Sequence, residues 1–261
     1  MAKIYYTIQE LQPQVDKLFE IGIVSGQYVG FDCLKDLYSI KLGCTTYVMG
    51  SPTSGKTELW FEFLINTSEF YGWKHVIYTP ETGSKDEIVA ELCSKFIKKP
   101  FYKNFNGAMS ESERYQALAF LNDYFYIIDP ADKDITVAEF YNEVDKIEKD
   151  LNIKIHTTTI DPYNELKHDL KDSNGRQDLY IESMLGMCRR NAMKYNRHNC
   201  IITHCADQKM ITNNGFTYYP PPTAREYAGG QAWYRKGLAM IGVWRPPNGL
   251  PDETGRPAED N

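Results

Sequence analysis

The chain has 261 residues, of which 42% are hydrophobic and 25% charged, and its formal net charge is −6. This composition is typical of a folded globular protein with a sizeable core. The acidic balance argues against a basic protein that coats nucleic acid, although a few basic loops could still contact a strand. No apolar run reaches the ~20 residues that span a bilayer, and the first residues lack the apolar segment of a signal peptide.

The six cysteines contain no CxxC pair, and several fall in apolar runs typical of strands or helices. They are Cys33, Cys44, Cys93, Cys188, Cys200 and Cys205. This pattern predicts reduced, buried thiols rather than a disulfide framework or a zinc site. We therefore expect a cytoplasmic protein without a membrane partner.

The N-terminal residues differ in pattern from the rest of the chain. Residues 7–24 predict an amphipathic helix that ends near Gly22, with Pro13 either early in it or breaking it. Residues 1–28 are therefore expected to form an arm that packs between subunits, and residues 29–261 the main domain. From residue 246 the chain is rich in proline, glycine and acids, which predicts a loop-like tail.

A complete G-x-x-x-x-G-K-[ST] phosphate-binding loop lies between a β-prone run at 45–49 and a helical run at 58–65. Its residues are Gly50, Ser51, Pro52, Thr53, Ser54, Gly55, Lys56 and Thr57. Such a loop turns its amides towards phosphates at a helix N-terminus. Lys56 is expected to reach the β and γ phosphates, and the Thr57 hydroxyl to hold Mg²⁺. The alternative is a chance match in a Gly/Ser-rich turn; the flanking pattern favours ATP, or another nucleoside triphosphate, with Mg²⁺.

Strand-like and helix-like segments alternate after this loop. Further β-prone runs lie at 75–79, 125–129, 156–160, 200–203 and 239–244, and helical patterns at 85–98, 137–151 and 178–195. Thr136 and Glu139 predict a capping box for the second of these helices. This alternation predicts an α/β fold with a mostly parallel central sheet flanked by helices. Ligands should then gather at the carboxyl ends of the strands.

Polar residues follow two of these strands. Glu81 comes just after the run at 75–79, where a carboxylate could activate the water that attacks the γ-phosphate. It could instead cap the following helix. Thr203 and His204 end a later strand and could hydrogen-bond the γ-phosphate. A zinc pair with Cys205, or a packed histidine, is the alternative, but no further ligands lie at zinc spacing.

Two Ile-Asp-Pro tripeptides compete for the carboxylate that serves Mg²⁺. One contains Asp129 and the other Asp161, and each follows β-prone residues. We favour Asp161, because its strand leads into a long polar loop. Asp129 is expected to begin a turn after a peripheral strand, which is the ordinary role of Asp-Pro.

Taken in order, these motifs resemble the RecA-like motor domain of DnaB-type hexameric replicative helicases, in the branch of Twinkle and the phage primase-helicases. The likeness runs from about Gly22 to Arg245. It is carried by the phosphate loop, Thr79-Pro80-Glu81, residues 160–166 with Asp-Pro-Tyr-Asn-Glu-Leu, Thr203-His204, residues 229–236 and Val243-Trp244-Arg245.

The resemblance implies the roles given above for Lys56, Thr57, Glu81 and Asp161, and makes His204 a γ-phosphate sensor. It implies that Arg245 is an arginine finger in the neighbouring subunit's ATP site. An exposed surface arginine is the alternative. Gln231 would couple the nucleotide state to the strand-binding loops.

Two loops are expected to hold single-stranded DNA at the centre of a ring, at residues 165–177 and 207–227. Their basic residues are Lys167, Lys171, Arg176, Lys209 and Arg225. Contacts of this kind grip phosphates without reading the sequence. Solvated polar loops are the alternative, although loops this long are more often functional or disordered.

The resemblance therefore predicts an ATP-dependent, ring-forming helicase or translocase in DNA replication, of the phage type and located in a host cytoplasm if phage-encoded. The sequence shows no primase domain and no helical collar, and it ends before the further strands that relatives have. A separate primase or loader is a reasonable expectation. The rival interpretation is a RecA-like ATPase that does not unwind, acting as a recombination mediator, loader or regulator. A nucleotide-dependent scaffold is a third, disfavoured by Glu81 and Arg245 together.

Overall fold

A computed structural model describes residues 5–23, 25–131, 133–206, 208–213, 215–227 and 231–251. Some predicted features lie outside this part of the chain: the start of the arm, Asp207 of the second loop, Gly229 and Gly230 of the resemblance, and the tail from residue 252.

Six parallel strands form the central sheet, in the order β3-β2-β4-β5-β1-β8. Their bounds are β1 Thr45–Gly50, β2 His75–Tyr78, β3 Phe125–Ile127, β4 Thr157–Ile160, β5 His198–His204 and β8 Ala239–Gly242. The predicted α/β class with a parallel sheet is confirmed. In register, Gly50 pairs with His204 and Tyr78 with Ile160, so the carboxyl ends of the inner strands meet at one edge.

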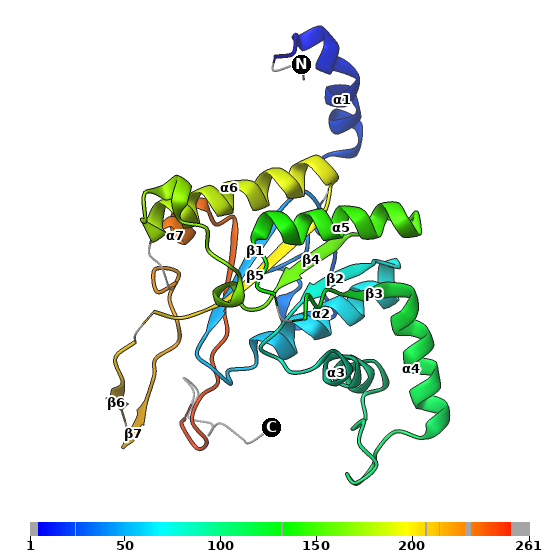
Figure 1. The fold of residues 1–261 in the computed structure, drawn as a ribbon, viewed down its shortest axis with the longest axis vertical. Helices are drawn as coiled ribbons and strands as arrows, with labels where there is room; N and C mark the ends of the chain where they lie inside the picture. Colours follow the sequence, from blue (N-terminus) through cyan, green and yellow to red (C-terminus); the bar gives the residue numbers. More distant parts are fainter. Residues whose placement is uncertain are drawn as a thin grey trace.

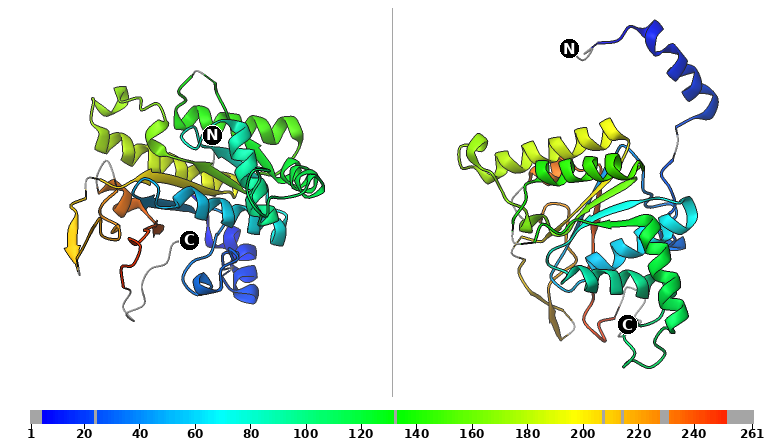
Figure 2. Two further views of the ribbon diagram at one scale, coloured as in Figure 1. Left: turned by 90° about the horizontal axis from the view of Figure 1, so that it is seen from below. Right: turned by 45° about the vertical axis from the view of Figure 1, so that its right-hand side comes forward.

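Helices cover both faces of the sheet (Figures 1 and 2). The α-helices of the described residues are α1 Ile8–Ile21, which lies apart from the sheet, and α2 Lys56–Tyr71, α3 Lys85–Ile97, α4 Glu111–Tyr124, α5 Val137–Leu151, α6 Gln177–Tyr195 and α7 Ala232–Lys236. Successive residues of β1 supply the two cores: Tyr47 packs with the α5 and α6 side, Val48 with the α2 and α3 side. The buried Trp60 indole of α2 donates to Thr159 of β4 at 2.8 Å, which fixes the helix after the phosphate loop against the sheet.

Helix α5 follows its sequence pattern closely. Thr136 and Glu139 form the predicted capping box, with the Thr136 hydroxyl accepting from the Glu139 amide at 3.2 Å. The apolar stripe at helical spacing includes Phe140 and Val144, both fully buried. The stripe is therefore the face that covers the sheet.

Several elements were not predicted, among them one helix of ordinary length, a hairpin and a very short helix. Helix α4 buries only Ala117 and Leu121, so its apolar periodicity is weak, although Ser110 and Glu113 do cap it. The antiparallel hairpin of β6 (Ile211–Asn213) and β7 (Phe216–Tyr218) projects from the body. Its strands and the five-residue α7 are too short to give a period.

The N-terminal helix α1 stands away from the body in Figures 1 and 2, and Pro13 lies inside it. None of its residues is buried, although it carries exposed apolar side chains such as Phe19. All six cysteines are free thiols. None of the helices in the described ranges has the length and apolarity needed to cross a membrane.

Candidate nucleotide site

The phosphate loop joins β1 to α2 and depends on its two glycines. Gly55 has φ +90°, a left-handed conformation that favours glycine. A Cβ at Gly50 would come within 2.4 Å of both the Ser54 Oγ and the Val243 carbonyl oxygen. The loop is therefore tightly folded against the chain that leaves β8.

Lys56 begins α2 and points back into the loop. Its Nζ donates to the carbonyl oxygens of Gly50 and Ser51, at 3.1 and 2.9 Å. Burial lowers the pKa of Lys56, and the Asp161 carboxylate opposes that shift. The Ser54 hydroxyl is buried without a hydrogen-bond partner among the described residues. A concave loop with an ammonium group and an unpaired hydroxyl fits the oxygens of a phosphate chain.

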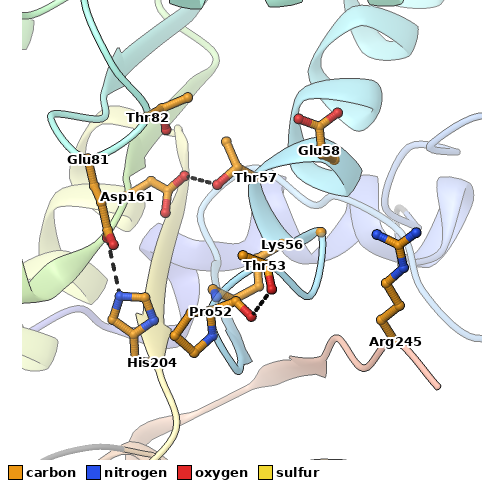
Figure 3. A pocket seen from close by; sticks show the side chains of 11 residues that line it. Pro52, Thr53, Lys56, Thr57, Glu58, Glu81, Thr82, Asp161, His204 and Arg245 are labelled. Carbon is orange, nitrogen blue, oxygen red and sulfur yellow. Dashed lines mark hydrogen bonds and ion pairs between the residues drawn. The ribbon is translucent and has the colours of Figure 1, made fainter. Parts of the chain in front are cut away.

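A cavity of about 380 Å³ opens at this loop and brings most of the predicted site residues together (Figure 3). Its lining is Pro52, Thr53, Gly55, Lys56, Thr57, Glu58, Glu81, Thr82, Asp161, His204 and Arg245. The strand ends of β2, β4 and β5 thus face the loop after β1, as the parallel register requires. The sequence did not single out Glu58 and Thr82, which adjoin the motifs.

Asp161 follows β4 and is 4% exposed. The Thr57 hydroxyl donates to its Oδ2 at 2.6 Å. Burial raises the pKa of Asp161 to about 6, while the Thr57 hydrogen bond and Lys56 oppose the shift. A hydroxyl and a carboxylate in contact are the oxygen ligands that fit Mg²⁺, either directly or through water.

Asp129 lies elsewhere, after the edge strand β3. Its carboxylate pairs with Lys85 at 2.9 Å and accepts from the Ala131 amide at 3.0 Å, and it is not in the lining of the phosphate-loop cavity. This is the turn geometry expected of the alternative Ile-Asp-Pro.

Glu81 and His204 point towards each other on one side of the cavity, with Glu81 Oε2 3.2 Å from His204 Nε2 (Figure 3). Glu81 does not cap α3, because Ser84 and Glu87 form that capping box. The His204 Nδ1 is buried without a partner in the described part of the chain. No group of three metal-ligating side chains gathers in the described ranges, so nothing there supports the zinc alternative.

Arg245 follows β8 and lies on the opposite side of the loop from Glu81 and His204 in Figure 3. Its side chain is exposed and borders this chain's own cavity. Gln231 is exposed at the N-cap of α7 and does not line the cavity. The structure thus brings nine predicted residues to this cavity, three of them from the loop ahead of Lys56, and leaves Gln231 outside.

The predicted DNA-binding side chains are all exposed: Lys167, Lys171, Arg176, Lys209 and Arg225. Two have partners. Arg176 pairs with Asp178 at 2.6 Å, and the Arg225 guanidinium lies 5.5 Å from the Tyr234 ring centroid. A short 3₁₀ turn at Tyr163–Glu165 leads into the first predicted loop, and a second lies within it, at Lys171–Ser173.

One contact at the site was not predicted. The Thr203 hydroxyl, next to His204, donates to Asn164 Oδ1 at 3.0 Å. It joins the end of β5 to the turn that opens the first basic loop. No sequence signal indicates this pair, because its members lie 39 positions apart.

Comparisons with known proteins extend these observations. The chain is 31% identical over 205 residues to a chloroplastic and mitochondrial Twinkle homologue of Arabidopsis thaliana, across 76% of this chain. One solved ATPase domain superposes with a TM-score of 0.66 at 15% identity, covering 90% of this chain and 82% of that one. A DnaB-like replicative helicase, described with its interactions with primase, superposes with a TM-score of 0.68 at 16% identity. The superposition covers 90% of this chain and 57% of the helicase chain. No family model matches.

These likenesses confirm the predicted resemblance. The chain is similar in sequence to a Twinkle homologue, and it shares a RecA-like fold with the two solved structures. It spans 28% of the length of the Twinkle homologue and 57% of the DnaB-like helicase chain.

Proposed function

We propose that this chain is an ATP-hydrolysing motor of the DnaB type that moves along single-stranded DNA. The observation that carries the proposal is the convergence of Lys56, Thr57, Glu81, Asp161 and His204 on one cavity at the phosphate loop. Each is of the residue type that phosphoryl transfer to water requires. Relatedness to Twinkle and to a DnaB-like replicative helicase supports the replicative setting.

The proposed chemistry follows from the position of each side chain. Lys56 gives up its contacts to the loop carbonyls and binds the β and γ phosphates. Thr57 and Asp161 hold Mg²⁺, which would neutralise charge on the phosphate oxygens. Glu81 accepts the proton of the attacking water. His204, 3.2 Å from Glu81, orients that carboxylate and hydrogen-bonds the γ-phosphate.

The proposed assembly is a homo-hexameric ring in a cytoplasm. Helix α1 with residues 1–28 forms the arm that packs on a neighbouring subunit, which its exposed apolar side chains support. The exposed lysines and arginines of the two basic loops grip the strand through its phosphates. Gln231 couples the nucleotide site to these loops. A separate primase or loader is a further proposed partner.

A strand-separation assay tests this function. The purified chain should hydrolyse ATP faster with single-stranded DNA, and rising salt should erode that stimulation as phosphate contacts weaken. It should also open a forked duplex, with or without an added loader. Lys56→Ala should abolish both activities. ATP hydrolysis without strand separation in all these conditions would favour the non-unwinding ATPase.

Asp161→Asn should separate stability from function. Burial raises the pKa of Asp161 to about 6, so the folded protein keeps a proton that the unfolded chain releases near pH ~4. Stability from this group is complete below that pH and is lost as pH rises through 6. In EDTA, Asp161→Asn should therefore have a higher free energy of unfolding than wild type above pH 6, by up to about 3 kcal/mol, and no advantage near pH ~4. Thermal melts should show this as a higher Tm above pH 6. Mg²⁺-dependent hydrolysis should be lost.

Asp129→Asn is the matched control for this prediction. It removes a carboxylate from an exposed ion pair, which contributes little to stability. Both its hydrolysis and its Tm profile with pH should stay close to wild type. Lost hydrolysis in Asp129→Asn, with normal hydrolysis in Asp161→Asn, would show that the metal carboxylate is assigned to the wrong Ile-Asp-Pro.

A further inference from the structure

The order of the strands gives the bound nucleotide a direction. Glu81, Asp161 and His204 follow β2, β4 and β5, which all lie on one side of β1 in the sheet. Strand β8 is the neighbour of β1 on the other side. If the terminal phosphate faces Glu81, as the proposed function requires, the phosphate chain crosses the loop and the base points towards the end of β8.

A second hollow, of about 320 Å³, lies on that side of the loop. It shares Pro52, Thr53 and Arg245 with the phosphate cavity, so the two hollows lie next to each other. Its outer walls come from the end of the β6–β7 hairpin, at Tyr218, and from Trp244 after β8. A nucleotide with its phosphates in the first hollow would therefore have the second hollow beside it, on the side of its base.

The aromatic walls are held in place by the backbone. The Trp244 indole N–H donates to the Tyr219 carbonyl oxygen at 2.8 Å, which ties the segment after β8 to the end of the hairpin. The Tyr218 and Trp244 ring centroids are 5.9 Å apart, at an interplanar angle of 45°. Since the indole N–H is already used and the side chain is half-buried, Trp244 offers its ring surface rather than a polar group.

The chemistry of the lining indicates how a base would be recognised. The described residues around this hollow include rings, prolines, Met210 and hydroxyls, with Arg245 as the single charge and no carboxylate or amide side chain. Carboxylates and amides are the side chains that best distinguish the hydrogen-bonding edges of adenine and guanine. A flat apolar ring instead accepts any base, because every base has a π face.

We propose that this hollow is the base subsite of the nucleotide, in which the base stacks on Trp244 with little discrimination between adenine and guanine. This inference rests on the proposed function, because it takes its direction from the phosphate site. A base of the DNA strand is the competing ligand, since the hairpin belongs to a predicted DNA loop. The walls shared with the phosphate loop favour the nucleotide.

Equilibrium binding to the full chain, measured by calorimetry with Mg²⁺, tests the proposal. The ligands are ATP, GTP and inorganic tripolyphosphate, which has the phosphates without a base. In wild type, ATP and GTP should bind within about threefold of each other and more tightly than tripolyphosphate. Trp244→Ala should weaken ATP binding by about tenfold or more and leave tripolyphosphate unchanged. Trp244→Phe should keep most of the ATP affinity.

Tyr218→Ala is the second variant, because it alters the opposite wall and is remote in sequence from Arg245. It should also weaken ATP more than tripolyphosphate. Tyr115→Ala, at an exposed ring on α4, is the matched control and should change neither ligand.

Several outcomes would overturn the base subsite. The phosphate site would stand, but this subsite would not, if both wall variants kept wild-type ATP affinity or weakened ATP and tripolyphosphate equally. Weaker binding of oligothymidylate with unchanged ATP affinity would assign the hollow to the DNA strand. If wild type bound neither ATP nor tripolyphosphate, the proposed phosphate site would fail together with the subsite.

Discussion

Glu81→Gln should bind ATP and Mg²⁺ about as well as wild type and turn ATP over roughly 10²–10⁴ times more slowly, the scale for losing a positioned general base. The amide keeps the size of the side chain and can still contact His204 Nε2, which lies 3.2 Å from the Glu81 carboxylate in the wild type. It cannot accept the proton of water. The loss should therefore fall on kcat in a steady-state assay, while a calorimetric Kd stays unchanged.

Two controls make this result specific. Glu111→Gln, at the start of α4, removes a carboxylate from an exposed ion pair with Lys103 and should leave kcat unchanged. His204→Asn tests the contact partner. It should lower kcat less than Glu81→Gln, because the carboxylate that takes the proton remains. Near-normal turnover in Glu81→Gln would remove Glu81 as the proposed base and leave the nucleotide site intact.

The parts of the site that the sequence predicted share a physical cause. The spacing of the phosphate loop is set by its backbone, so Gly50, Gly55 and Lys56 can be recognised from the chain alone. Glu81, Asp161 and His204 follow β-prone runs, and parallel strands bring their carboxyl ends to one edge. Local pattern and a single topological rule therefore suffice to place these side chains near one another.

The parts that the sequence did not predict depend on register between distant elements. Trp244 meets the hairpin because β8 pairs with β1, with Ile241 opposite Val48, and because a short antiparallel hairpin folds back beside it. Thr203 meets Asn164 across two different strand ends. No periodicity marks such pairs, since each is produced by packing of the whole sheet rather than by the segment itself. No periodicity marks Gln231 either, because its predicted role came from the resemblance and not from a pattern in the sequence.

The position of Arg245 is compatible with two roles in ATP hydrolysis. It borders this chain's own phosphate cavity, and it also follows β8, an edge strand of the sheet. As part of the lining of this cavity, Arg245 would act on the nucleotide bound by the same chain. A neighbouring copy of the chain that packed against the β8 edge of the sheet would meet Arg245, as a shared ATP site requires. The proposed finger takes the second role, in which it stabilises charge that develops on the phosphates of the neighbour.

Arg245→Ala should bind ATP normally and hydrolyse it at least ~10³-fold more slowly, the lower end of what arginine fingers contribute. Arg114→Ala, which removes an arginine lying over the Tyr115 ring on α4, should have no such effect.

Mixing Arg245→Ala with Lys56→Ala should then restore part of the activity, although each variant alone is inactive. Restoration arises at interfaces where an Arg245→Ala subunit supplies the intact loop and a Lys56→Ala subunit supplies the intact arginine. If Arg245 served its own nucleotide, every subunit of the mixture would lack one essential group, and the mixture would stay inactive. Light scattering on the same samples must show that the two variants assemble together. A rate per subunit that stays constant on dilution to a demonstrated monomer would contradict the shared site, and the ring with it.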